Sequence, residues 1–280
     1  MVTRIISAAI GIAIAIAVLF LHATPAFNLV VAALAVIMLY ELLSANKCLQ
    51  YKFHSGVCFA FAAAMPFLLE YTEGMEVIYI FGTSCILLLF AGSIAKHKEI
   101  TFEKVAYMFT VSLLTTLPMC CLVSLENADS VHGVCYIVLC LAGAWLGDSG
   151  AYFVGTFWKF WEKHKLCPEI SPKKTWEGAV GGVITVGLVF ALYAFGYQIV
   201  QGYRGYNFEV NYLYLVIMGL VCGVLGIIGD LSASLIKRQY GIKDFGNIMP
   251  GHGGLMDRFD SVLFVAPFMM FVLSHFTIFK

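Results

Sequence analysis

Long apolar stretches dominate this 280-residue chain and constrain its fold more than any other feature. About nine of them approach the ~20 residues that an α-helix needs to cross a bilayer. Because hydrocarbon offers no partners for backbone N–H and C=O groups, such stretches cross a membrane as helices. The expected spans are 5–23, 27–45, 56–72, 76–95, 105–125, 133–157, 178–200, 211–233 and 259–279. The sequence therefore predicts an all-α, polytopic integral membrane protein.

The proportions of residue types agree with this class. Of the 280 residues, 61% are hydrophobic and 12% are charged. Soluble globular domains contain about 45–50% apolar and about 25% charged residues. Arg4 and the apolar run after it resemble a signal peptide, but the run is long and further spans follow directly. We therefore expect an uncleaved first helix.

Lysine and arginine residues indicate which side of the membrane each loop faces. If the N-terminus is cytoplasmic and the spans alternate, 15 of the 17 Lys and Arg residues fall in cytoplasmic segments. This asymmetry follows the positive-inside rule. It predicts a cytoplasmic N-terminus, and it places the two longest polar loops, 158–177 and 234–258, on the cytoplasmic face.

Glycine separates the chain into two parts. Residues 1–130 contain 5 of the 26 glycines, and residues 131–280 contain 21. The later part has three glycine pairs at the spacing that lets helix backbones approach closely in lipid. These pairs are Gly143/Gly147, Gly178/Gly182 and Gly219/Gly223. We interpret residues 131–280 as a tightly packed functional core and residues 1–130 as helices that support it or form a subunit contact.

Several acids are predicted at the cytoplasmic ends of the spans, namely Asp148, Asp230, Asp257 and Asp260. A charge at the centre of a membrane helix costs about 2.5–3.5 kcal/mol on insertion scales, so it usually has a function. Several acids at one depth repel each other unless a cation lies among them. Hard oxygen ligands of this kind suit magnesium. A fifth acid, Glu41, is interpreted instead as a snorkelling residue or part of a structural ion pair.

Helical spacing groups the first of these acids with bases. Asp230, Ser234, Lys237 and Arg238 follow the pattern i, i+4, i+7 and i+8, so one continuous helix would place them on one face. The carboxylate would then lie deeper in the membrane than the hydroxyl and the two bases.

Glycine and histidine precede the last two acids. Gly251, Gly253 and Gly254 allow close backbone approach to a ligand. The free N–H groups at the start of the following helix, together with His252, are expected to help bind phosphate.

The other cytoplasmic loop contains the run Ser171-Pro-Lys-Lys-Thr-Trp-Glu-Gly178. A helix is expected to begin near Thr175 or Trp176. Lys173 and Lys174 alone would indicate membrane topology or contact with anionic lipid. Beside a helix N-terminus, two lysines also form a phosphate site.

Taken together, these residues resemble a known signature. Ser234-x2-Lys237-Arg238-x4-Lys243-Asp244-x5-Pro250-x-His252-Gly-Gly-x2-Asp257-Arg258-x-Asp260 is similar to that of the phosphatidate cytidylyltransferases, or CDP-diacylglycerol synthases. The run from Ser171 to Gly178 and Asp148-x3-Tyr152 resemble two further stretches of that family. The resemblance covers residues 140–260 in motif and the whole chain in size and hydropathy.

The resemblance implies an enzyme that transfers CMP from CTP to phosphatidate and releases pyrophosphate, with one Mg²⁺ ion or two as cofactor. It implies Asp230 and Asp257 as metal ligands, and these two acids with Lys237 and Arg238 as catalytic residues. The expected substrate-binding residues are Lys173, Lys174, Ser234, Lys243, Asp244, His252, Arg258, Asp148 and Asp260. Residues 131–280 would then be the catalytic core.

The implied partners are CTP, phosphatidate, membrane lipids and a second copy of the chain, with no nucleic acid. A homodimer through the N-terminal helices would be typical of the family. The compact length favours a bacterial inner-membrane enzyme whose active site faces the cytoplasm.

Three alternatives compete with this interpretation. Another CTP-using membrane enzyme, such as a polyprenol or dolichol kinase, would share the helices and phosphate loops but not the signature. A transporter or channel would need polar residues in both membrane halves, and the outer halves contain almost none. A scaffold or lipid-binding protein would not need three membrane-edge acids beside six bases.

Overall fold

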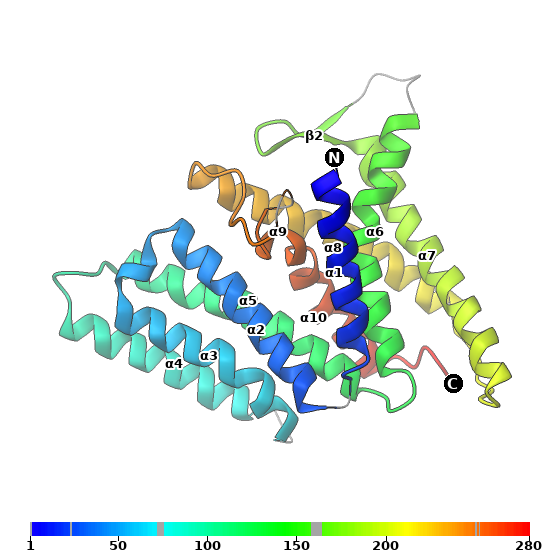
Figure 1. Cartoon of the computed structure of the whole chain (residues 1–280), viewed down its shortest axis with the longest axis horizontal. Coiled ribbons are helices and arrows are strands. Elements are labelled where there is room, and N and C mark those ends of the chain that lie inside the picture. Colours follow the sequence, from blue (N-terminus) through cyan, green and yellow to red (C-terminus); the bar gives the residue numbers. More distant parts are fainter. Residues whose placement is uncertain (1, 23, 72–75, 158–163, 250, 252) are drawn as a thin grey trace. The chain divides into compact units, whose positions relative to one another are not determined.

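The computed structural model describes residues 2–22, 24–71, 76–157, 164–249, 251 and 253–280. Within them the chain is mainly helical, with two short β-strands (Figure 1). It divides into two compact units. Unit 1 comprises Met1–Asn127 and Lys237–Arg258, and unit 2 comprises Ala128–Ile236 and Phe259–Lys280. The segment Lys237–Arg258 thus belongs to the same unit as the N-terminal helices.

Unit 1 is a bundle of apolar helices. They are α1 (Val2–Leu19), α2 (Pro25–Ala45), α3 (Lys52–Tyr71), α4 (Glu76–Ala95) and α5 (Phe102–Asn127), with a short 3-10 turn at Cys48–Gln50. Helix α2 begins with Pro25, whose missing N–H costs nothing at the first helical position. Helices α2, α3 and α5 pack against one another. Their contact buries Leu39, Met65 and Met108 completely, so these three helices form the core of the unit.

Unit 2 contains α6 (Gly133–Phe157), α7 (Trp176–Tyr203), most of α8 (Tyr212–Gln239) and α10 (Val262–His275). Helices α6 and α7 pack along much of their length. At Gly182 an added Cβ would lie 2.6 Å from the carbonyl oxygen of Gly147, and at Gly223 it would lie 2.8 Å from Cα of Val183. The predicted glycine spacing therefore does bring these helix backbones together.

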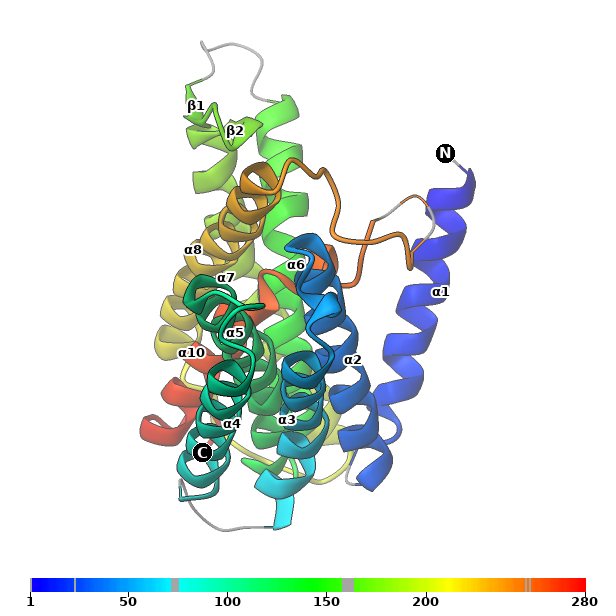
Figure 2. The same ribbon diagram turned by 90° about the vertical axis from the view of Figure 1, so that its left-hand side faces the viewer.

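A β-hairpin occupies the described part of the loop 158–177. Strand β1 (Lys165–Cys167) pairs antiparallel with β2 (Ser171–Thr175), next to the start of α7 (Figure 2). The sequence did not predict these strands. The helix start was predicted correctly, because α7 begins at Trp176 and Thr175 Oγ1 accepts a hydrogen bond from Gly178 N at 3.1 Å.

The prediction of an all-α membrane protein is confirmed. Seven helices among the described residues are long and apolar enough to cross a bilayer, namely α2 to α8. They match seven of the nine predicted spans. The number of spans and the orientation of the chain stay predictions.

The predicted last span, 259–279, is wrong as one continuous helix. The short helix α9 ends at Phe259, and α10 covers only Val262–His275. Fourteen residues reach about 21 Å, which is less than the ~30 Å of a hydrocarbon core. The C-terminal residues are extended, because Phe279 forms a β-bridge with Val210. Backbone pairing to the segment before α8 thus replaces the end of the expected helix.

Candidate active site

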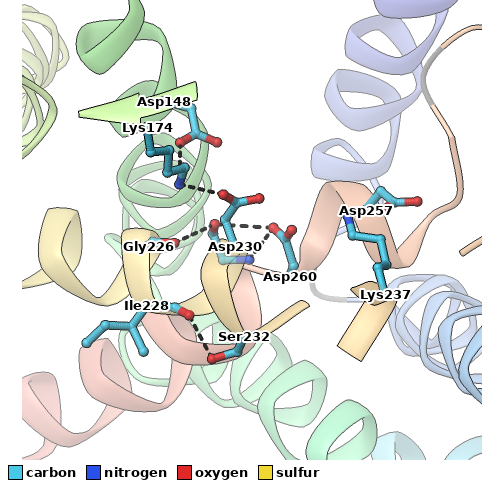
Figure 3. Close-up of polar contacts among 10 residues, drawn as sticks. Asp148, Lys174, Gly226, Ile228, Asp230, Ser232, Lys237, Asp257 and Asp260 are labelled. Atoms are coloured by element: carbon cyan, nitrogen blue, oxygen red, sulfur yellow. Dashed lines mark hydrogen bonds and ion pairs between the residues drawn. The ribbon is translucent and has the colours of Figure 1, made fainter. Parts of the chain in front are cut away.

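Lys174 joins two acids of unit 2. Its Nζ lies 2.5 Å from Asp230 Oδ2 and 3.5 Å from Asp148 Oδ1 (Figure 3). The three side chains come from β2, α8 and α6. We call Asp148, Lys174 and Asp230 the Lys174 cluster. It unites two stretches that are far apart in the sequence, as the predicted site required.

Local structure places Lys174 at this position. The hairpin that carries it is tied to α7, because His164 Nδ1 lies 2.9 Å from Glu177 Oε1 and Trp176 N donates to His164 O at 2.9 Å. Lys174 and Asp230 are about one-fifth exposed, with side-chain exposures of 22% and 23%, whereas Asp148 is 58% exposed. The cluster is therefore half-buried on one side and open on the other.

The charges of the Lys174 cluster do not cancel. Burial alone would lower the pKa of Lys174, but the carboxylates of Asp148 and Asp230 outweigh burial and raise that pKa above its ordinary value. The lysine therefore stays protonated at neutral pH. Counted over these three residues alone, two carboxylates face one ammonium group.

Asp260 and Ser261 lie directly before α10, and Ser261 joins this segment to α8 inside unit 2. Asp260 is 7% exposed, and its Oδ1 accepts a hydrogen bond from Ser261 N at 2.6 Å. Ser261 Oγ lies 2.9 Å from the carbonyl oxygen of Gly226 and 3.2 Å from Asp260 Oδ1. The Ser261 hydroxyl thus fixes this segment on α8, and the predicted role of Asp260 toward substrate stays a prediction.

A second polar group surrounds Asp257 in unit 1. Asp257 Oδ1 lies 2.6 Å from Lys237 Nζ (Figure 3), and Oδ2 accepts hydrogen bonds from Phe245 N at 2.9 Å and Gly254 N at 3.0 Å. The Asp257 side chain is 5% exposed. Gly253 has φ +88°, which favours glycine and lets the chain turn back toward the carboxylate. We call the segment between α8 and α9, residues 240–255, the signature loop. Asp257 therefore organises this loop, in addition to any part that it has in the chemistry.

Glu41 of α2 holds the same loop. Its Oε1 accepts a hydrogen bond from Leu255 N at 3.0 Å and its Oε2 accepts one from Met256 N at 2.7 Å. The interpretation of Glu41 as a snorkelling residue or ion-pair member is wrong, since the side chain is 2% exposed and these contacts are to backbone. Free N–H groups at the start of this helix were expected to help bind phosphate, but those of Gly254, Leu255 and Met256 donate to Asp257 and Glu41.

Comparison with known proteins decides the family. Residues 2–276 match the model of the cytidylyltransferase family. The chain belongs to this family. It is 40% identical to a phosphatidate cytidylyltransferase of Bacillus subtilis (strain 168) over 192 residues, 69% of this chain and 66% of that protein. It is 30% identical to the phosphatidate cytidylyltransferase of Haemophilus influenzae over 288 residues, 96% of each chain. The family resemblance drawn from the motifs is thus confirmed.

Other predicted residues of this cytidylyltransferase lie where solvent reaches them. Those classed as exposed are Lys173, Arg238, Lys243, Asp244 and Arg258. Ser234 is buried, and His252 lies outside the described residues. The roles of these residues toward substrate stay predictions.

The Lys174 cluster fits the magnesium ion that the family resemblance implies. Mg²⁺ usually binds through one or two carboxylates and completes its shell with water and substrate phosphates. Asp148 and Asp230 already converge on one cationic group. Among the described residues no three His, Cys, Asp or Glu side chains form a metal site by themselves, so substrate oxygens would have to contribute ligands. Asp230 and Asp257 belong to different units, and their predicted common metal site stays a prediction.

Proposed function

We propose that this chain is a phosphatidate cytidylyltransferase. The phosphate monoester of phosphatidate attacks the α-phosphorus of CTP, a P–O bond forms to the lipid, and pyrophosphate leaves, which yields CDP-diacylglycerol. The observation that supports this most is the Lys174 cluster, in which stretches typical of the family meet in space. The names of the relatives from Bacillus and Haemophilus point to the same substrates.

The chemistry needs cations more than it needs a general base. A phosphate monoester is an anionic nucleophile near neutral pH, so its oxygen requires no deprotonation by the protein. The difficulty is the approach of two polyanions, which positive groups aimed at the phosphates relieve. Bound Mg²⁺ would supply charge neutralisation and alignment of phosphate oxygens. Asp148 and Asp230 of unit 2 would hold it, and the ligand role that the family resemblance implies for Asp257 stays a prediction.

The basic residues divide into two kinds by their surroundings. Lys174 and Lys237 are paired with acids in half-buried or buried positions. Lys173, Lys243 and Arg258 are exposed and would grip the phosphates of CTP and lipid as they arrive. In this proposal the exposed bases recruit the soluble nucleotide, and the paired lysines align it.

The proposal includes a location and a partner. Bacterial relatives and apolar helices support an integral protein of the inner membrane, with its active site toward the cytoplasm, where CTP is made. Lipid tails would stay in the bilayer while the head group reaches the acids at the membrane edge. We also propose that two copies of the chain form a homodimer through their N-terminal helices.

A labelling experiment tests the reaction and separates it from a lipid kinase. Purified protein in detergent receives phosphatidate, Mg²⁺ and CTP labelled at either the α- or the γ-phosphate. A cytidylyltransferase moves the α-label into lipid and leaves the γ-label in pyrophosphate. A CTP-dependent kinase, tested with polyprenol or dolichol, moves only the γ-label into lipid. No α-label in lipid from folded protein would refute the proposal.

A further inference from the structure

One residue of unit 1 that the proposed reaction does not use is a buried acid in an apolar helix. Glu41 lies in α2 with 2% exposure. Each of its carboxylate oxygens accepts one backbone hydrogen bond, from Leu255 N and from Met256 N. A buried carboxylate without partners is costly, so these two bonds explain how the acid is tolerated.

We propose that Glu41 is a positioning residue that holds the signature loop in the geometry that cytidylyl transfer requires. The inference rests on the proposed function for the reaction, but its structural part concerns unit 1 alone. Glu41 does not touch the reacting atoms in this proposal. It acts through the backbone that carries Asp257.

Two carboxylates fix this backbone from different elements. Asp257 takes the N–H groups of Phe245 and Gly254, and Glu41 takes the next two N–H groups along the chain. Three successive N–H groups are thereby occupied, and the last of them belongs to Met256, the first residue of α9 (Met256–Phe259). The loop therefore has little freedom to shift Asp257 away from Lys237, its ion-pair partner at 2.6 Å.

The loop is shaped to receive the Glu41 carboxylate. An added Cβ at Gly254 would lie 2.5 Å from Glu41 Oε1, and one at Gly246 would also collide with that oxygen. Glycines at two points of the loop thus make room for one carboxylate. This close fit between the two glycines and the carboxylate is expected if Glu41 fixes the position of the loop in addition to being buried.

Glu41→Gln is the sharpest variant, because it keeps size and shape. A glutamine side chain has one acceptor oxygen, and its NH₂ group would face the second N–H as donor against donor. We expect one of the two loop contacts to be lost. A small displacement of a positioned group costs on the order of 10- to 100-fold in turnover, so kcat should fall by about that factor.

Asn28 offers a matched control on the same helix. It is also 2% exposed, but its Nδ2 donates to Glu70 of α3 and not to the loop. Asn28→Ala should lower the melting temperature as much as or more than Glu41→Gln and leave kcat per folded protein unchanged. A purely structural role for Glu41 would make the two variants behave alike.

The decisive experiment combines turnover with hydrogen–deuterium exchange of the protein in nanodiscs. In Glu41→Gln, the peptide covering residues 244–257 should exchange faster than in wild type, and kcat should fall more than KM for CTP rises. In Asn28→Ala that peptide should be unchanged. Wild-type exchange and wild-type kcat in folded Glu41→Gln would overturn the proposal.

The test also works if Glu41→Gln does not fold or if the wild-type protein is inactive. If Glu41→Gln does not accumulate as folded protein, Gly246→Ala tests the same contact from the loop, and normal exchange and turnover there would overturn the proposal. If wild-type protein makes no CDP-diacylglycerol, the proposed function fails. The exchange comparison then decides by itself whether Glu41 holds the loop.

Discussion

Lys174 Nζ lies 2.5 Å from Asp230 Oδ2, so a lysine on a β-hairpin neutralises an acid in the apolar helix α8. Asp148 of α6 approaches the same ammonium group at 3.5 Å. Three elements of unit 2 thus meet at one charged point. In a cytidylyltransferase, a metal ion would have to compete with the lysine for the two acids, and phosphates would have to compete with the acids for the lysine.

Removal of the Lys174 ammonium group should nearly abolish CMP transfer. In Lys174→Met the two acids lose their cation and the phosphates lose a donor, so kcat/KM should fall about 10²- to 10³-fold. Steady-state kinetics with CTP and phosphatidate measure the effect. Lys98→Met is the control, since Lys98 is an exposed lysine of unit 1 in the turn after α4. Activity of Lys174→Met within a factor of two of wild type would contradict the assignment.

The pH dependence of stability should carry the signature of this lysine. Its folded pKa is raised, so its contribution is complete below the ordinary lysine value of about 10.4 and is lost as the pH rises through the folded value. The difference in melting temperature between wild type and Lys174→Met should therefore be constant from pH 7 to 9 and shrink only above about 10.4. Scanning calorimetry in EDTA measures it, and a difference that shrinks near pH 8 would be inconsistent with the raised pKa.

The sequence predicted those features that depend on local pattern. Apolar length located the seven long helices, and the run around Thr175 located the start of α7 because a cap is a contact between close neighbours. The hairpin was missed, since β1 has only three residues and shows no alternation. The shortening of the last span was missed too, because it depends on the bridge between Val210 and Phe279.

The candidate site shows the same division. Asp148, Lys174 and Asp230 were selected through motifs, but that one ammonium group joins both acids follows only from the packing of α6, β2 and α8. Glu41 was misjudged because its partners, Leu255 and Met256, lie at the other end of the sequence. No spacing rule connects an acid to backbone groups so far away. The local sequence gives one indication of such a contact, namely an acid in an apolar helix that has no basic residue close to it.

Breaking the Asp257–Lys237 pair should affect both chemistry and stability. Asp257→Asn removes the charge and the oxygen that faces Lys237, 12% exposed, and leaves one amide oxygen for the two loop N–H groups that donate to Oδ2 in the wild type. Loss of one member of a buried pair costs about 3–5 kcal/mol. We expect a large fall in melting temperature and loss of Mg²⁺-dependent CMP transfer. Near-normal transfer by correctly inserted protein would refute the ligand role predicted for Asp257.

An exposed pair of the same chemistry provides the control. Lys96 and Glu99 lie 3.0 Å apart with side-chain exposures of 55% and 62%. Exposed pairs contribute about 0–1 kcal/mol, so Glu99→Gln should change stability by no more than that and leave turnover unchanged. Equal effects of Asp257→Asn and Glu99→Gln on melting temperature would show that burial of the Asp257 pair has no energetic weight.

Close packing of α6 against α7 should make Gly182 intolerant of any side chain. In Gly182→Ala the new Cβ would lie 2.6 Å from the carbonyl oxygen of Gly147, and backbone cannot yield as a flexible side chain does. Overpacking of this kind costs about 1–3 kcal/mol. Gly196→Ala in the same helix meets nothing within 4 Å and should be neutral or slightly stabilising. Thermal unfolding of both variants in one detergent compares them directly, and equal melting temperatures would contradict the close contact between the two helices.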